Sequence, residues 1–242
     1  MKKKGNKRQY NIFLIVGIVI VLTAIFIAVF CPIITKYDPL LVNVEERITA
    51  PTGQHKLGTD EMGRDVLSRM FFGVRASMII GVSVAIISTM AGIIVGVIAG
   101  YYNKVDNVLM RILDGVMAFP SIIIAIALAG ILGTGKINII IALSVAYFPT
   151  MARIVRSSVL SLRDIEYVQS IKVLGASDVY IIIHHIIPNI ISPIIVQMTF
   201  IFALAVFDEA ALSYLGRYKV RIWTIKWRSL RTINSPNSWP LK

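Results

Sequence analysis

The chain has 242 residues, of which 56% are hydrophobic and 16% are charged, and its formal net charge is +12. Its mean hydropathy is +0.75, and soluble domains carry about a quarter charged residues, so the composition indicates a membrane protein. A basic nucleic-acid-binding module would show a polar face with base-stacking aromatics, whereas this sequence shows long apolar runs. We therefore expect an all-α polytopic membrane protein that lies in membrane lipid and binds no nucleic acid.

The N-terminal segment MKKKGNKRQY is basic and precedes an apolar run that extends from Ile12 to Phe30. This run is too long for the core of a signal peptide and lacks a small-residue cleavage site, so we interpret it as a retained signal anchor. The basic residues before the run place the N-terminus in the cytoplasm by the positive-inside rule.

A membrane-spanning helix needs about 20 predominantly apolar residues. Runs of roughly this length predict five spans, at Ile12–Ile34, Ala76–Tyr101, Val116–Leu132, Ile137–Ala152 and Ile186–Phe207. Alternation from a cytoplasmic N-terminus places residues 35–75 outside and residues 102–115 and 153–185 inside. The last of these segments is basic, as cytoplasmic loops are.

The second predicted span carries a row of glycines, Gly92, Gly96 and Gly100, which form two overlapping GxxxG steps. Such rows allow helix backbones to approach closely in lipid, so we predict that this row packs against another helix. The alternative is that the glycines only reflect the general frequency of glycine in membrane helices.

The sequence predicts no catalytic, cofactor-binding or metal-binding residue. Residues 130–136 have the glycine and lysine spacing of a phosphate-binding loop, but Ile137 stands where a Ser or Thr would hold magnesium, and the loop follows a membrane helix instead of a strand. His184 and His185 would point about 100° apart on a helix and could not readily chelate one ion together. A secondary carrier would be expected to carry charged relay residues inside its spans, and none occurs near a span centre.

Residues 163–187, here called the coupling segment, differ in composition from the apolar runs on either side. The pattern predicts a helix up to Val173, a turn at Gly175 and an N-cap at Ser177 that starts a second helix. We expect the second helix to end near Ile187, because Pro188 breaks helices. Two short helices joined at a glycine would form a cytoplasmic knob suited to the groove of a soluble partner, unless the segment lies on the lipid surface as an amphipathic loop.

Several motifs occur together in the order of a known family. The chain resembles the permease subunits of binding-protein-dependent ABC importers, specifically the second permease type of the dipeptide/oligopeptide/nickel branch. The resemblance extends from the N-terminal anchor to about Gly216. It is carried by LGTDEMGRDVLSRMFFGVRAS (57–77), DGVMAFPSIIIAIAL (114–128), ARIVRSSVLSLRDIEYV (152–168), LGASDVYIIIHHIIPN (174–189) and DEAALSYLG (208–216).

The resemblance implies a multi-pass protein of the cytoplasmic membrane that supplies half of the translocation path for di- or oligopeptides or nickel-type complexes. It implies as partners a homologous permease subunit, two ATPase subunits that hydrolyse the ATP, and an extracytoplasmic substrate-binding protein. The coupling segment is expected to dock on the ATPase. The docking positions implied are Gln169, Ser170, Ile171, Gly175, Ala176, Ser177 and Asp178. The family has Glu-Ala-Ala at the first three of these positions, so docking is expected to be altered here.

We expect three parts: residues 1–75 as the anchor span and an extracytoplasmic loop, residues 76–216 as the permease domain, and residues 217–242 as an aberrant tail. The tail holds seven basic residues, no acidic residue and all three tryptophans, and it has no run able to form the family's sixth span. The abrupt change at Arg217 predicts a frameshift or comparable truncation, which the coding DNA after codon 216 would test. If the chain is truncated, it could be a non-functional remnant of a permease. A secondary transporter is the other alternative to an active permease subunit.

Overall fold

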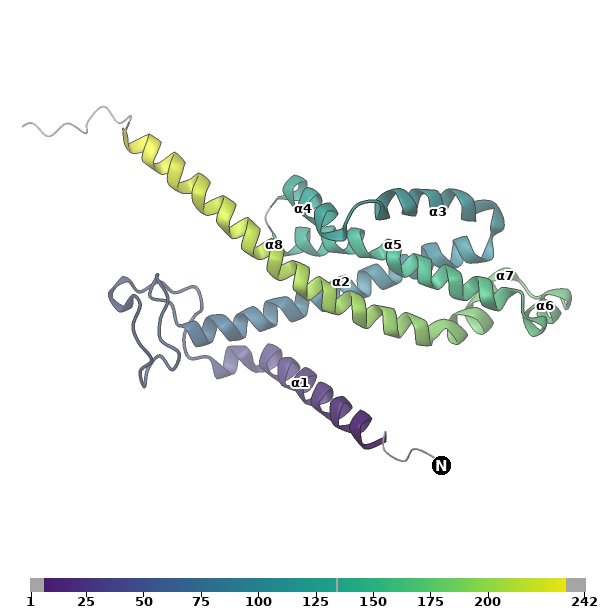
Figure 1. Ribbon diagram of the computed structural model, residues 1–242, viewed down its shortest axis with the longest axis horizontal. Coiled ribbons are helices and arrows are strands. Elements are labelled where there is room, and N and C mark those ends of the chain that lie inside the picture. The colour runs from purple at the N-terminus through teal and green to yellow at the C-terminus, as the bar shows by residue number, and fades with distance from the viewer. Residues whose placement is uncertain (1–6, 134, 234–242) are drawn as a thin grey trace, which may run out of the picture. The chain divides into compact units, whose positions relative to one another are not determined.

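The computed structural model describes residues 7–133 and 135–233, and in this part of the chain the regular structure is helical (Figure 1). The helices are α1 (Lys7–Ile34), α2 (Val66–Tyr101), α3 (Asn103–Met117), α4 (Ser121–Leu132), α5 (Lys136–Arg163), α6 (Glu166–Val173), α7 (Asp178–Ile181) and α8 (Ile191–Ile233). The prediction of an all-α fold is confirmed. The chain divides into two compact units, Met1–Ile79 and Ile80–Lys242, and α2 belongs to both.

Four helical stretches of the described chain are long and apolar enough to cross a membrane, namely Ile12–Ile34, Val66–Tyr101, Lys136–Arg163 and Asp178–Tyr214. A fifth candidate is the pair formed by α3 and α4, which is bent by 84°. Counting this pair as one span gives the five that the sequence predicts.

The predicted straight span at Val116–Leu132 is wrong. The first helix of the bent pair ends at Met117, and the second begins at Ser121 after Pro120, which occupies its N-cap position in an extended conformation. Proline has no N–H for the helix ladder and disfavours a helical conformation in the residue before it, so the chain turns at this point. The helix after the turn has 12 residues, or about 18 Å, and is too short to cross a bilayer core of about 30 Å alone.

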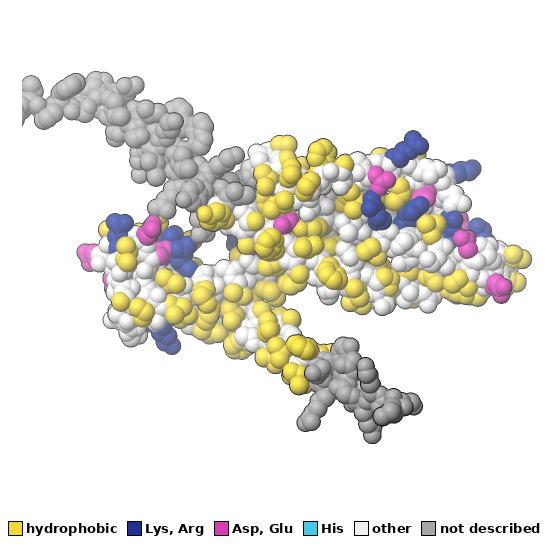
Figure 2. All heavy atoms as spheres, in the orientation of Figure 1, with side chains coloured by type: hydrophobic (Ala, Val, Ile, Leu, Met, Phe, Trp, Pro, Cys, Tyr) yellow, Lys and Arg dark blue, Asp and Glu magenta, His cyan; other side chains and the backbone are white. Residues whose placement is uncertain are grey.

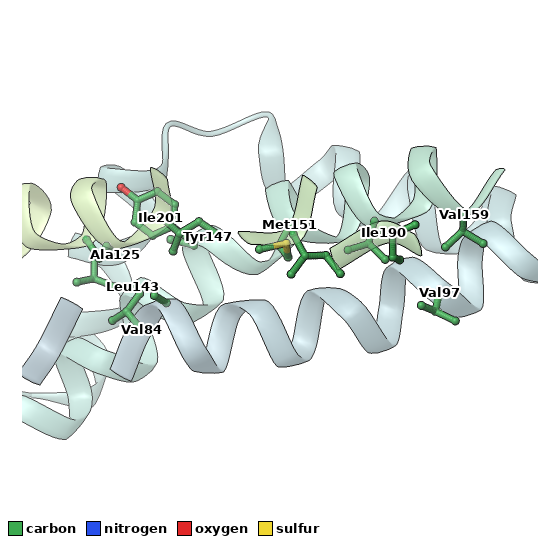
Figure 3. Close-up of a cluster of buried hydrophobic side chains, with 14 of the residues drawn as sticks. Val84, Val97, Ala125, Leu143, Tyr147, Met151, Val159, Ile190 and Ile201 are labelled. Carbon is green, nitrogen blue, oxygen red and sulfur yellow. The ribbon is translucent and has the colours of Figure 1, made fainter. Parts of the chain in front are cut away.

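In the second unit, α5 forms the centre of the helix packing and contacts α3, α4 and α8. Its buried side chains Leu143, Tyr147, Met151, Val155 and Val159 recur every four residues and therefore lie on one face. Figure 3 shows this face between residues of the neighbouring elements, with Val84 and Val97 of α2 on one side, and Ile190, just before α8, and Ile201 of α8 nearby. Many large hydrophobic side chains are exposed, and on the face seen in Figure 2 they are spread along the helices, as suits contact with lipid.

The three glycines of the predicted packing row lie against α5. A Cβ atom added at Gly92 would lie 2.4 Å from Met151 Cγ, one at Gly96 would lie 2.5 Å from the carbonyl oxygen of Ala152, and one at Gly100 would lie 2.7 Å from Val159 Cβ. These distances leave no space for a side chain. The backbone of α2 therefore rests directly on α5 along three helical turns, which is the close approach that small residues permit in lipid.

We predict that Gly96→Ala destabilises the second unit by about 1–3 kcal/mol, because the new methyl group would meet a backbone atom that cannot rotate away. Gly73→Ala is the matched control in the same helix, since Gly73 has open space around its Cα and alanine is the better helix former. Thermal unfolding of the purified protein in detergent measures both. Equal unfolding midpoints for the two variants would contradict the packing described for Gly96.

Candidate functional site

The turn of the coupling segment is built by a glycine in a left-handed conformation. Gly175 has φ +87°, and its N–H donates to the carbonyl of Lys172 at 3.0 Å while the N–H of Ala176 donates to the carbonyl of Ile171 at 3.3 Å. This pair of bonds is the Schellman arrangement, which satisfies the last carbonyls of a helix and requires a left-handed residue at this position. The turn therefore reverses the chain between α6 and α7 within four residues.

The two helical parts of the coupling segment, before and after Gly175, are here called its arms. The second arm does not end near Ile187, as the sequence predicts. Ser177 caps α7 by accepting a hydrogen bond from the N–H of Tyr180 at 3.4 Å, but the helix then continues through Pro188 into α8. A wide π-turn at Ile182–Ile186 and a 3₁₀-turn at Ile187–Ile190 join the two helices. The wide turn accommodates the missing N–H of the proline and its clash with the carbonyl four residues earlier. The arm is thus continuous with the last span, which begins at Asp178 and not at Ile186.

The coupling segment lies at one end of the second unit, beyond the end of α5, with α6 outermost (Figure 1). Its tip is apolar and open, because Val173 and Leu174 are each 86% exposed. These two residues line a shallow groove together with Glu166, Gln169 and Ser170. An exposed pair of large apolar side chains beside a groove is a surface suited to a protein partner.

The predicted docking residues divide into three groups. Four of them are exposed on the surface, namely Gln169, Ser170, Gly175 and Ser177. Ile171 and Ala176 instead pack against the hydrophobic core of the second unit. Asp178 is half-buried and bound to another helix, as described next. The sequence alone does not show which residues face outward. The four residues from Gln169 to Lys172 cover a full turn of helix and so point to all sides of it.

Contacts that the sequence analysis missed join the coupling segment to α2. The hydroxyl of Tyr101, the last residue of α2, donates to Asp178 Oδ1 at 2.8 Å, and Lys172 Nζ lies over the Tyr101 ring, 5.7 Å from its centroid. Arg163 Nη1 donates to the carbonyl of Gly100 at 2.8 Å. The hydrogen-bonded tyrosine and aspartate are separated by 77 residues, and no local pattern indicates such a pair.

Two further ion pairs hold α3 against α5 at the same end. Arg156 binds Asp106 with both Nε and Nη2, each at 2.5 Å, and Arg153 Nη2 binds Asp114 Oδ1 at 2.5 Å. The first pair is bidentate and largely shielded from solvent, so it fixes geometry as well as contributing energy. The second pair is half-exposed and contributes little to stability.

A separate polar cluster organises the loop of the first unit. Buried His55 lies between two carboxylates, with Nδ1 2.9 Å from Asp65 Oδ1 and Nε2 3.3 Å from Glu46 Oε2. Asp65 also accepts from the N–H of Ser68 at 2.7 Å and so caps the start of α2. The hydrogen bond with Asp65 raises the pKa of His55 above its usual value. Burial alone would raise the pKa of Asp65, but its hydrogen bonds with His55 and Ser68 lower it.

Asp60 is the second anchor of this loop. It binds Arg64 through a 2.9 Å hydrogen bond from Nε and also binds Arg69 of α2. Burial would raise the pKa of Asp60, but hydrogen bonds from the backbone and guanidinium of Arg64 hold that pKa far below its usual range. The loop also needs a glycine at position 63, where φ is +70° and an added Cβ would overlap the carbonyl of Asn43. The cluster around His55 and the ion pairs of Asp60 therefore both hold the loop in its fold.

Among the described residues, no group of three or more His, Cys, Asp and Glu side chains is arranged to hold a metal ion. The second unit has a packed hydrophobic core, and the exposed side chains of Val173 and Leu174 form an apolar tip at one end of it. Residues 88–239 match the family model described as the binding-protein-dependent transport system inner membrane component. The chain belongs to this family. The matched range extends past Gly216, the last residue of the quoted motifs.

The chain is also similar to named permease proteins. It is 43% identical over 201 residues, 83% of this chain and 68% of the relative, to a peptide transport system permease protein of Brucella suis. It is 40% identical over 207 residues, with 85% and 68% coverage, to the dipeptide transport system permease protein of Alkalihalophilus pseudofirmus. It is 39% identical, with the same coverage, to the oligopeptide transport system permease protein of Bacillus subtilis. The chain is therefore a multi-pass permease component of an ABC importer in the cytoplasmic membrane, as the motifs predict.

We predict that the loop of this permease's first unit is most stable between about pH 4 and about pH 6.5. The raised pKa of His55 means that its contribution is present below the unfolded pKa and is lost as pH rises through the folded pKa. The lowered pKa values of Asp60 and Asp65 mean that their contribution is present above the unfolded pKa and is lost as pH falls through the folded pKa. Hydrogen–deuterium exchange of residues 43–65, corrected for the intrinsic pH dependence, measures this. An unchanged loss of protection at high pH in His55→Gln would refute the role of His55.

We also predict a graded response at Gly175. The space around it is open, so the cost of a substitution comes from the left-handed backbone, about 1–2 kcal/mol for a residue with a Cβ. Gly175→Asn should lower the unfolding midpoint least and Gly175→Val most, because asparagine tolerates this conformation and β-branched residues do not. Gly115→Val, in open space within α3, is the control for helix propensity alone. Equal midpoints for the Asn and Val variants at position 175 would show that the Schellman turn is not required.

Proposed function

We propose that this permease supplies half of the translocation path of an importer for di- or oligopeptides. Support comes from its relatives, whose names specify peptides, dipeptides and oligopeptides, and another relative from Pectobacterium atrosepticum, 35% identical, is named for glutathione, itself a peptide. A homologous permease subunit would supply the other half of the path, and an extracytoplasmic binding protein would deliver the substrate. Nickel-type complexes stay a prediction of the motifs.

We further propose that two separate ATPase subunits hydrolyse the ATP and that the coupling segment docks on one of them. The observation that carries this proposal is the tip of α6, where Val173 and Leu174 are each 86% exposed. The Gly175 turn joins this tip to the helical stretch that begins at Asp178 and continues into α8. Apolar side chains this open in a cytoplasmic loop would be buried in a partner's groove. The positively charged residues around the loop support its cytoplasmic placement.

The mechanism follows from the continuity of the helices. A force applied to the tip would be carried by α6 into α5 across the short junction at residues 164–165, and by α7 into α8 through the turns around Pro188. Both routes consist of helix except at the two-residue junction of the first, and packed helices move as rigid bodies. Closure of the ATPase subunits would in this way change the orientation of the spans and alternate the access to the path.

Cysteine crosslinking tests the docking. In a chain whose Cys31 is replaced by alanine, Val173→Cys should form a disulfide with a cysteine in the ATPase groove of the assembled importer. Ile112→Cys in α3, 59% exposed and outside the coupling segment, is the control and should not. Leu174→Asp should abolish uptake of radiolabelled dialanine and trialanine in a strain that lacks its own permease, with the protein still present in the membrane. Crosslinking at Ile112 and not at Val173, or uptake retained by Leu174→Asp, would exclude docking through this tip.

A further inference from the structure

We propose that Tyr101 is a positioning residue for transport, through which the coupling segment sets the position of α2. The proposal rests on the proposed docking function and identifies the route by which a docked segment acts on α2. Unlike α5 and α8, α2 has no covalent junction with the coupling segment. A displacement of that segment reaches the end of α2 either through the packing of α2 on α5 or directly, through side-chain contacts with the segment.

Tyr101 contacts both arms of the coupling segment with one side chain. Its hydroxyl donates to Asp178 at the start of α7, and its ring faces the ammonium group of Lys172 at the end of α6. These two partners lie on opposite sides of the Gly175 turn. A hydrogen bond to a carboxylate is about twice as strong as one between neutral groups, and the cation–π distance of 5.7 Å is within the range of about 6 Å at which attraction is effective.

The position of Tyr101 in α2 makes these contacts mechanically relevant. It directly follows Gly100, the last glycine of the packing row, whose carbonyl accepts a hydrogen bond from Arg163 of α5. The row leaves no space between α2 and α5, so α2 cannot yield locally without disturbing packed backbone. Displacement delivered to Tyr101 would therefore be passed to the whole packed stretch of α2.

The Tyr101 side chain is half-buried and packs against the hydrophobic core of the second unit, and Asp178 is half-buried. The hydrogen bond therefore joins the coupling segment to a side chain that the core holds in place. Asp178 occupies the first turn of α7, where a carboxylate is favoured by the helix dipole. One oxygen of Asp178 accepts the Tyr101 hydroxyl from this position.

Spin-label distances in the assembled importer test the proposal without reference to a substrate. Labels are placed at Ile98→Cys in α2, 39% exposed, and at Val179→Cys in the coupling segment, 62% exposed, with Cys31 replaced by alanine. In the otherwise unchanged protein, the distance between the labels should stay narrow and constant whether the ATPase subunits are nucleotide-free or trapped with ATP. In Tyr101→Phe, the distribution should broaden and shift when ATP is bound, because α2 no longer follows the segment.

Asp114→Ala is the matched control, since it removes an interhelical polar contact, between α3 and α5, that does not involve the coupling segment. Tyr101→Phe, Asp178→Ala and the double variant form a cycle in which the second change should add little to the first. An unchanged distribution in Tyr101→Phe, equal broadening in Asp114→Ala, or full additivity in the cycle would overturn the proposal. Failure of the docking itself appears separately, as absence of the Val173 crosslink in the protein with Tyr101 intact.

Discussion

The close backbone contact between α2 and α5 is the constraint on which the second unit depends. Lipid tails are as apolar as leucine, so helices in a membrane gain little from burying hydrophobic side chains and associate through packing and polar contacts. Gly92, Gly96 and Gly100 supply that packing, because each leaves its Cα face open to the backbone or Cβ of α5. The four-residue repeat of the glycines on α2 faces a four-residue repeat of buried side chains on α5.

The polar contacts at the coupling end complete this arrangement. Arg163 satisfies the carbonyl of Gly100 at the end of α2, where a helix leaves backbone oxygens without partners. Arg156 and Asp106 fix α3 beside α5, and Asp178 receives the Tyr101 hydroxyl. Arg163 and Asp178, which make two of these contacts, belong to the coupling segment that carries the proposed docking surface. We therefore expect that a partner bound at the tip would displace several spans through these contacts.

The sequence predicted those features that depend on local pattern. Length and hydrophobicity located the spans, spacing identified the glycine row, and the Gly175 and Ser177 signals located the turn and the N-cap, since each follows from the requirements of a few adjacent residues. The two prolines were harder. Pro120 lies at a sharp bend between two helices. Pro188 instead follows a widened turn within a continuous helical stretch. Which of the two occurs depends on the tertiary surroundings of each proline.

Contacts between distant residues lay beyond sequence reasoning. Tyr101 and Asp178 are separated by 77 residues, and His55 is brought between Glu46 and Asp65 by a loop that the sequence shows only as charge-balanced. The inward placement of Ile171 and Ala176 likewise follows from packing against the core. Docking at the residues implied by family resemblance stays a prediction, and which of them face outward could be seen only in the fold.

The most direct test of the central claim, that α2 and α5 move as one packed pair driven from the coupling segment, is an electron cryomicroscopy structure of the complete importer with and without bound ATP. The account predicts that the spans change orientation between the two states while the backbone of Gly96 keeps the same distance from the carbonyl of Ala152. A slide of α2 along α5, with Gly96 moved to a different turn of the partner helix, would contradict it.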